Sequence, residues 1–183
     1  QQAVFFYANA ADTTTTGVDV VVDYLTDFGD YGAIKWTFSG NYNKNEFDRV
    51  IPPAFGFTLI DRVRQGDFTQ GQPRDKEIFS ADYKRGRFSS TVRVTRYGKI
   101  IQRSSNPALD ETISPAGIVD IDLAYEVTDN VRVSIGANNF TDVYPDVVQP
   151  GNRGGANPFT YYNQYSPYGI GGGFYYAKVN VEF

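Results

Sequence analysis

Hydrophobic and polar residues alternate one by one over most of this chain. In residues 119–127, the odd positions carry Val, Ile, Leu, Tyr and Val, and the even positions carry Asp, Asp, Ala and Glu. Residues 174–183 alternate in the same way, and their apolar side consists of Tyr175, Ala177, Val179, Val181 and Phe183. Because side chains of a β-strand alternate between its two faces, each segment predicts a strand with one apolar face and one polar face.

Comparable segments predict roughly eight strands joined in sequence. The predicted strands span residues 2–9, 13–24, 33–47, 78–83, 88–97, 119–127, 131–138 and a last segment from about 171–173 to 183. We find no convincing helical pattern between them. The expected fold class is therefore all-β, with the antiparallel up-and-down order of a barrel.

The predicted connections fall into two kinds that alternate along the chain. The short turns lie at residues 27–32, 84–87 and 128–130. The long loops lie at residues 48–72, 98–117 and 141–169. Outer-membrane β-barrels sort their connections in this way, with short turns in the periplasm and long loops outside the cell. The pattern predicts a transmembrane β-barrel segment with a periplasmic C-terminus, whose apolar strand faces meet lipid.

Composition narrows the possible functions. The chain has no Cys and no His, which excludes disulfides and Cys-based metal sites and removes the commonest general base. The net charge of -4 argues against a nucleic-acid partner. No apolar run is long enough for a transmembrane helix, whereas 14 Tyr and 14 Phe suit aromatic belts at a membrane interface. We expect no enzyme activity, no catalytic residue, no metal and no cofactor.

Two patterns that resemble functional motifs have simpler interpretations. Asp120, Asp122 and Glu126 share one strand face and could form an acid/base or calcium site. That face is the predicted barrel interior, where solvated charges are ordinary, and no further motif defines a cleft. The glycines of residues 169–173 lead into a strand rather than a helix, so we do not interpret them as a phosphate-binding loop.

Aromatic residues of the last long loop have two interpretations that stay open. They are Tyr144, Phe159, Tyr161, Tyr162, Tyr165 and Tyr168. Tyrosine rings gather at the membrane interface of barrels, and they also provide a rigid contact surface with a hydroxyl for ligands. Interface or loop packing receives the greater weight. The ligand hypothesis holds that some of these residues contact an imported molecule.

Several segments resemble the last barrel strands of TonB-dependent outer-membrane receptors. The resemblance rests on residues 119–127, on residues 131–145 and on the last strand, and it extends over the whole chain. Its most specific part is Gly-Ala-Asn-Asn-Phe-Thr-Asp-Val-Tyr-Pro at residues 136–145, which is similar to a segment beside the family's last extracellular loop.

The resemblance implies a C-terminal portion, residues 1–183, of a larger barrel of roughly 22 strands. It implies partners that this chain lacks: the N-terminal barrel strands, the plug domain, and TonB acting through that plug. It also implies a bacterial outer-membrane location, contact with outer-membrane lipid, and uptake of a nutrient or siderophore-like ligand. Tyr175, Val179, Val181 and Phe183 resemble the terminal signal that the barrel-assembly machinery recognises.

Two other functions are compatible with parts of the pattern. A complete eight-stranded barrel with a structural or adhesive role requires the first and last strands to pair. A soluble β enzyme or lectin requires a second sheet over the apolar faces, and it gives no reason for the sorted loop lengths.

Overall fold

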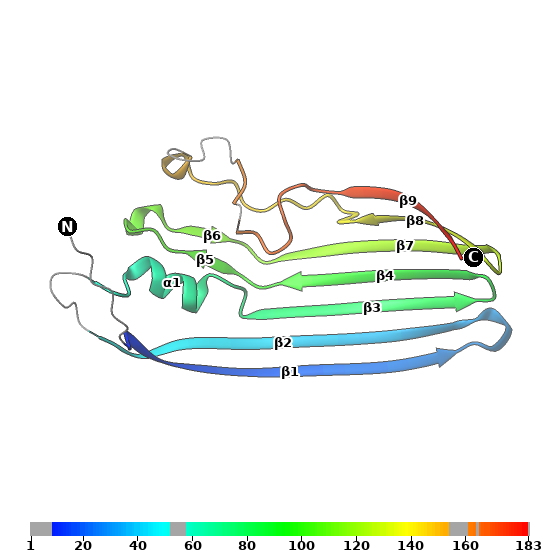
Figure 1. The fold of residues 1–183 in the computed structure, drawn as a ribbon, viewed down its shortest axis with the longest axis horizontal. Helices are drawn as coiled ribbons and strands as arrows, with labels where there is room; N and C mark the ends of the chain where they lie inside the picture. Colours follow the sequence, from blue (N-terminus) through cyan, green and yellow to red (C-terminus); the bar gives the residue numbers. More distant parts are fainter. Residues whose placement is uncertain (1–8, 52–57, 154–160, 164, 183) are drawn as a thin grey trace.

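The computed structural model describes residues 9–51, 58–153, 161–163 and 165–182, and its main feature is one antiparallel sheet (Figure 1). Seven strands form this sheet in the order in which the chain makes them. They are β1 (Ala11–Asp27), β2 (Ala33–Val50), β3 (Asp75–Arg85), β4 (Phe88–Tyr97), β7 (Ala116–Thr128), β8 (Val131–Asn138) and β9 (Phe174–Val181). The predicted all-β, up-and-down arrangement is confirmed. The strand expected at residues 2–9 lies outside the described residues except at Asn9, which is not in a strand.

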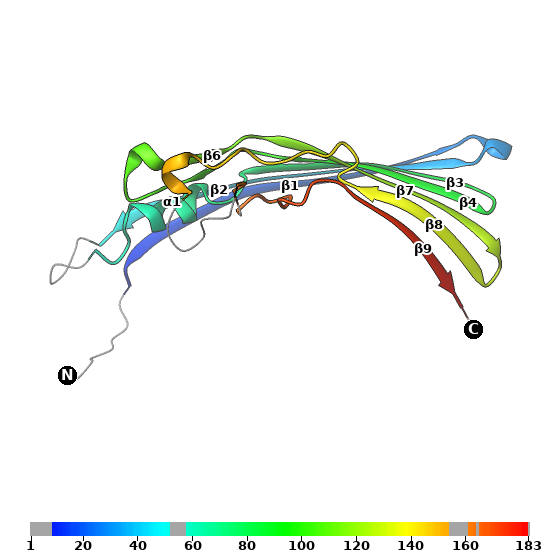
Figure 2. The ribbon, with the colours of Figure 1, turned by 90° about the horizontal axis from the view of Figure 1, so that it is seen from above.

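The sheet is open, and β1 and β9 are its two edges. It curves so that β8 and β9 bend away from the plane of the other strands (Figure 2). The two edge strands also differ in length, because β1 has 17 residues and β9 has 8. A small closed barrel requires its first and last strands to pair, and no such pairing exists among the described residues. An open sheet of this kind is what the expected portion of a larger barrel would form.

The hydrogen-bonding register places the apolar side chains of all seven strands on one face. One row across five strands consists of Val22, Phe38, Phe79, Val94 and Val119. The next row, on the opposite face, consists of Asp23, Thr37, Ser80, Arg93 and Asp120. The apolar face is open to its surroundings, since Ile135 is 59% exposed and Val179 is 63% exposed. The predicted division into one apolar and one polar face is confirmed for each strand.

On the side of the long loops, the apolar face gives way to charged residues. Arg96 follows Val94 on this face, and its guanidinium lies 2.5 Å from Asp75 and 2.8 Å from Glu77. On β7 the apolar run extends from Val119 to Val127, a length of about 27 Å at the rise of a strand. Because barrel strands tilt by about 35–45°, such a run spans about 20 Å of the apolar band, which is roughly 25 Å tall.

Aromatic rings lie on the same face near the short turns. This group consists of Tyr24, Trp36, Tyr83, Phe88 and Tyr125. The ring centroids of Tyr83 and Phe88 are 6.1 Å apart, and the Tyr83 hydroxyl donates a 2.6 Å hydrogen bond to the Tyr31 carbonyl. Aromatic rings at one edge of an apolar band are typical of a membrane interface. The sequence pattern did not single out this group, because its members lie far apart in the chain.

The two kinds of connection lie at opposite ends of the sheet, as predicted (Figure 1). The short turns follow β1, β3 and β7, and the turn after β1 contains the 3-10 helix η1 (Gly29–Tyr31). The long connections contain α1 (Arg62–Gln70), the hairpin β5 (Ile100–Gln102) and β6 (Glu111–Ile113), and the 3-10 helices η2 (Pro107–Leu109) and η3 (Pro150–Asn152). None of the helices in the described part of the chain is long and apolar enough to cross a membrane.

The sequence shows no convincing helical pattern, yet the first long connection contains the helix α1. Asp61 caps this helix, because its carboxylate accepts a 2.9 Å hydrogen bond from the Arg64 N–H. The helix is almost entirely polar and has Gly66 at its centre, so it lacks the apolar periodicity by which a helix is recognised. The side chain of Arg103 occupies the space beside Gly66, where an added Cβ would lie 2.7 Å from it.

Tyr176 connects the last three strands across the polar face. Asp122, Gly136 and Tyr176 are opposite one another on β7, β8 and β9. The Tyr176 ring lies over Gly136, and its hydroxyl donates a 2.8 Å hydrogen bond to Asp122. A Cβ on Gly136 would lie 2.4 Å from this hydroxyl and 2.7 Å from the Ile121 carbonyl. Because Gly136 has no side chain, Tyr176 on the edge strand β9 can reach across β8 and form a hydrogen bond to β7.

Replacing Gly136 with Ala is expected to destabilise the sheet by about 1–3 kcal/mol, the usual cost of forcing extra volume into a filled site. The matched control is Gly117→Ala on β7, where an added Cβ meets nothing within 4 Å. Urea unfolding followed by the fluorescence of Trp36, the chain's single tryptophan, compares the two variants. Equal midpoints for both variants would contradict this role for Gly136.

Candidate functional site

The three long connections meet at the end of the sheet opposite the short turns (Figure 1). The first of them returns onto the polar face through α1. The ring of Phe68 on this helix lies 4.9 Å from the ring of Phe47 on β2, and Asn45 donates a 3.3 Å hydrogen bond to the Phe68 carbonyl. Phe47 and Asn45 are on the polar face of β2. The helix therefore covers part of the face that a closed barrel would turn inward.

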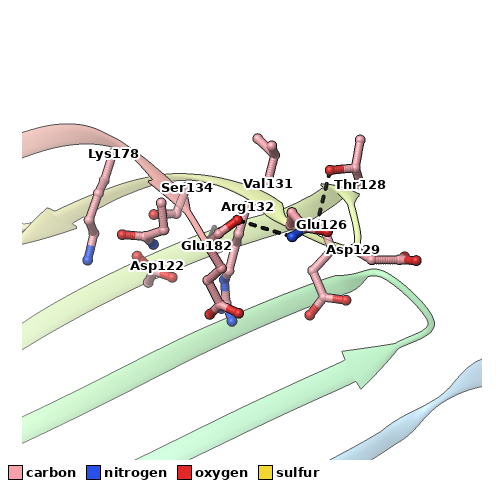
Figure 3. A pocket seen from close by; sticks show the side chains of 11 residues that line it. Asp122, Glu126, Thr128, Asp129, Val131, Arg132, Ser134, Lys178 and Glu182 are labelled. Carbon is pink, nitrogen blue, oxygen red and sulfur yellow. Dashed lines mark hydrogen bonds between the residues drawn. The ribbon is translucent and has the colours of Figure 1, made fainter.

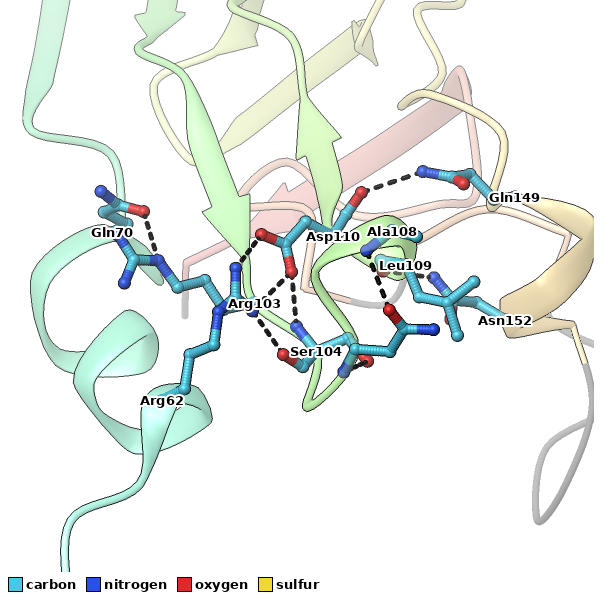
Figure 4. Close-up of polar contacts among 10 residues, drawn as sticks. Arg62, Gln70, Arg103, Ser104, Ala108, Leu109, Asp110, Gln149 and Asn152 are labelled. Atoms are coloured by element: carbon cyan, nitrogen blue, oxygen red, sulfur yellow. Dashed lines mark hydrogen bonds and ion pairs between the residues drawn. The ribbon is translucent and has the colours of Figure 1, made fainter.

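Arg62 on α1 joins the first long connection to the second (Figure 4). Its guanidinium donates hydrogen bonds of 2.7 and 2.5 Å to the two oxygens of Asp110, and it also contacts the Ser104 carbonyl. The Ser104 N–H donates a 2.9 Å hydrogen bond to the same carboxylate. These bonds, chiefly those from Arg62, lower the pKa of Asp110 from its ordinary 3.8 to about 2. The contact is ionised at neutral pH.

Glu111 joins the second long connection to the third. This side chain is 7% exposed and accepts hydrogen bonds from the Gln149 N–H at 3.0 Å and from the Asn152 amide at 2.5 Å. Asn152 also donates a 2.9 Å hydrogen bond to the Leu109 carbonyl (Figure 4). A buried carboxylate is stable only when its charge is compensated by such donors. The three connections therefore form one continuous unit.

The third connection returns across the polar face of β4 and β7 before β9 begins. The rings of Tyr168 and Tyr97 are 5.8 Å apart, and Asn163 donates a 3.0 Å hydrogen bond to Gln102 on β5. Beside Tyr97, Thr95 is 6% exposed and Ile118 is 7% exposed, although both belong to the polar face. Burial raises the pKa of Tyr168 above its ordinary value. This part of the connection would narrow the interior of a closed barrel.

The tyrosines of the predicted loop set divide into separate groups. The ring of Tyr162 lies 5.1 Å from the rings of both Tyr144 and Tyr161, and the guanidinium of Arg153 lies 5.0 Å over Tyr161. Tyr144 is 41% exposed and Tyr161 is 56% exposed. We call Tyr144, Tyr161, Tyr162 and Arg153 the tyrosine cluster.

The other members of the set lie elsewhere. Tyr168 packs on Tyr97, and Tyr165 is exposed. Phe159 lies outside the described residues. Sequence reasoning did not identify Arg153, because no spacing rule connects it to the tyrosines.

The segment that carried the family resemblance is a structured turn. Asn139 and Asp142 both have a positive φ, which non-glycine residues seldom adopt. The Asn139 amide donates to the Val143 carbonyl at 2.7 Å and accepts from the Val143 N–H at 2.9 Å. Asp142 accepts a 2.8 Å hydrogen bond from the Gly173 N–H, where the chain enters β9. These side chains shape the third connection. The expectation that the glycines of residues 169–173 lead into a strand is confirmed.

The acidic residues of β7 line the polar face, and two of them have structural partners. Asp120 accepts a 2.9 Å hydrogen bond from the Asn139 N–H, and Asp122 accepts the one from Tyr176. Asp122 and Glu126 border a hollow of about 590 Å³ near the short turns, together with Arg132 and Lys178 (Figure 3). Within the described ranges, no group of three His, Cys, Asp or Glu residues is arranged to hold a metal ion.

The residues expected to form a terminal assembly signal share the apolar face of β9. Tyr175 is 64% exposed, Val179 is 63% exposed and Val181 is 49% exposed. Phe183 lies outside the described residues. The chain end is held to the last short turn, since the Glu182 N–H donates a 2.9 Å hydrogen bond to the Asn130 carbonyl. Recognition of these residues by an assembly machinery stays a prediction.

Comparison with known proteins identifies the kind of fold. A family model described as TonB dependent receptor-like, beta-barrel, matches residues 1–140. The solved structure of a copper transporter, OprC, superposes with a TM-score of 0.60 at 16% sequence identity. The alignment covers 94% of this chain and 24% of that chain, so this chain spans about a quarter of the transporter's length. At this identity the likeness shows the fold alone. A search of the curated proteins finds no match.

The contact between Arg62 and Asp110 predicts a specific dependence on pH. The folded pKa of about 2 lies below the ordinary 3.8, so ionised Asp110 stabilises the joined loops above pH 3.8. This stabilisation is expected to be lost as the pH falls through 2. Asp110→Asn is expected to increase proteolysis within residues 98–115 at neutral pH. The control is Asp129→Asn, which removes the exposed ion pair with Arg87 in a short turn. Equal cleavage rates in the two variants would count against the proposed role of Asp110.

Proposed function

Because the chain belongs to the family of TonB-dependent receptor-like β-barrels, we propose that it is part of the wall of an outer-membrane receptor that imports a nutrient or siderophore-like ligand. The observation that carries this proposal is the continuous apolar face across seven strands. A soluble protein would have to cover such a face, whereas lipid solvates it. The chain acts as part of a transporter rather than an enzyme.

The proposed orientation places the short turns and the C-terminus in the periplasm and the long connections outside the cell. The difference in length between the two sets of connections supports this orientation. The aromatic residues near the short turns would then lie at the periplasmic interface of the bacterial outer membrane. Each of the seven strands would cross the membrane, so the segment is multi-pass.

Both edges of the sheet require partners. The exposed backbone N–H and C=O groups of β1 and β9 cannot remain unpaired in lipid. We expect other strands of the same receptor to pair with them. The proposal that residues 1–183 form the C-terminal portion of its barrel rests on the sequence resemblance to the last strands of such receptors. The polar face would then surround the receptor's plug, and TonB would act through that plug. The barrel-assembly machinery would recognise Tyr175, Val179, Val181 and Phe183.

The tyrosine cluster is the proposed point of ligand contact. Its rings project from a connection that is fixed by hydrogen bonds at both ends, which lowers the entropy lost on binding. Tyr165 belongs to the same connection and is exposed, so it is included in the proposed contact. Phe159, which lies outside the described residues, is included from the sequence alone. Tyr168 has a second role, because its packing on Tyr97 holds the connection against the wall.

Ile135→Arg tests the membrane location of the apolar face. The substitution is expected to cost about 2–4 kcal/mol if Ile135 lies near the bilayer midplane. The matched control, Thr37→Arg, places the same charge on the polar face beside Asp23, and we expect it to be tolerated. The measurement is the amount of heat-modifiable barrel in outer-membrane fractions. Normal assembly of the Ile135 variant would exclude a lipid-facing position.

Replacing Tyr161, Tyr162 and Tyr165 together with Ala is expected to weaken ligand binding to whole cells by about tenfold or more, because aromatic anchors dominate binding energy. The control replaces Tyr31, an exposed tyrosine in a short turn outside this connection. Receptor abundance is measured in parallel by immunoblotting. Unchanged binding by the first variant would remove the cluster from the ligand site and leave the membrane proposal intact.

A further inference from the structure

A polar groove lies at the long-loop end, between the end of α1, the start of β3 and the start of β5. It has a volume of about 240 Å³, and it is lined by Gln70, Gln72, Arg74, Asp75, Lys99 and Ile101. It is separate from the tyrosine cluster, whose residues do not line it. The groove also lies beyond the charged residues that end the apolar face, so water reaches it.

The charge of the groove is positive. Within the described part of the chain, neither Arg74 nor Lys99 forms an ion pair. Asp75 is the single carboxylate in the lining; it shares Arg96 with Glu77, so these three groups together carry one negative charge. The C-terminus of α1 contributes about half a negative charge, and the two positive charges of Arg74 and Lys99 exceed this total of about one and a half. The groove therefore attracts anions, although the chain as a whole has a net charge of -4.

The Gln70 amide of the groove is oriented with its donor end free. The side-chain oxygen of Gln70 accepts a 3.2 Å hydrogen bond from Arg103 Nε (Figure 4). This bond leaves the NH₂ group of Gln70 as the free part of its amide. A ligand in the groove would meet this NH₂ group, the guanidinium of Arg74 and the ammonium of Lys99. Such a set matches an anion whose oxygens accept several hydrogen bonds.

Hydrogen bonds and burial fix the backbone at the two cationic residues, Arg74 and Lys99. The carbonyl of Arg74 accepts a 2.7 Å hydrogen bond from the Asn43 N–H on β2. Lys99 lies between Gly98, whose N–H donates a 2.8 Å hydrogen bond to the Asp75 carbonyl, and Ile100, which is 1% exposed. The positions of both Cα atoms are thus fixed before a ligand arrives, which favours binding.

We propose that this groove binds a phosphate group through Arg74, Lys99 and the Gln70 amide. The group can belong to a free phosphorylated solute or to a lipid headgroup, because the groove lies just above the end of the apolar face. The proposal goes beyond import and holds whether or not the phosphate compound is the transported ligand.

The test uses the whole receptor that contains this chain, purified in a non-ionic detergent. Titration calorimetry measures binding of inorganic phosphate, and phosphorus analysis measures the lipid phosphate that remains bound after purification. The test variant is Arg74→Gln with Lys99→Gln. The control, Arg49→Gln with Lys84→Gln, makes the same change in charge at two exposed positions away from the groove. Lys99→Gln alone is a second variant, which leaves the more enclosed Arg74 unchanged.

Two results support the proposal, and they distinguish the sources. If the test variant binds inorganic phosphate about tenfold or more weakly than the control, and all proteins retain equal lipid phosphate, the ligand is a free solute. Lower lipid phosphate in the test variant than in the control identifies a headgroup. If phosphate binding and lipid phosphate are the same in the test variant, Lys99→Gln and the control, the proposal is overturned. None of these outcomes depends on transport, so they remain separate from the test of the tyrosine cluster.

Discussion

The common register of seven strands is the constraint on which the rest of this structure depends. A shift of one residue in any pairing would move the apolar side chains of that strand onto the polar face. The described pairs shift register at Asp12/Thr13 and at Glu126/Thr128, both at strand ends. Between these points Val22, Phe38 and Phe79 stay in one row. The sheet therefore keeps a single face for lipid and a single face for water and for the plug of the proposed receptor.

The long connections follow a different physical principle from the sheet. They are held together by charged and amide side chains, of which Arg62, Asp110 and Glu111 join three parts of the chain. The most buried large side chains of the described residues, Ile100 and Ile113, also belong to this region. The strand ends thus carry a small packed unit outside the apolar band. This unit supports both the tyrosine cluster and the phosphate groove, and it fixes their positions relative to the barrel wall.

The strands and their faces could be predicted from the sequence because each depends on neighbouring residues. The alternation of Val119, Ile121 and Leu123 is visible without knowledge of the fold. Helix α1 was not recognised, because it lacks apolar periodicity and its packing partners Phe47 and Arg103 are distant in the sequence. Its Asp61 cap is a local signal, but a single capping residue does not define a helix. The β5–β6 hairpin was missed because three-residue strands carry too little periodicity. The tyrosines were identified by their density, but the contact of Arg153 with Tyr161 depends on the folded loop.

The central claim is that one face of the sheet meets lipid while the other faces a water-filled interior. These 183 residues contain no cysteine, so a single cysteine placed along residues 131–138 carries the one spin label of this part of the receptor. The measurement is the accessibility of each label to oxygen, which enters lipid, and to a water-soluble nickel complex, in the receptor reconstituted in bilayers. The account predicts high oxygen accessibility at 131, 133 and 135, and high nickel accessibility at 132 and 138. Ser134, Gly136 and Ala137 are left unlabelled, since Ser134 and Ala137 are buried and the Tyr176 ring lies over Gly136. Accessibility without a period of two, or with the two faces reversed, would contradict it.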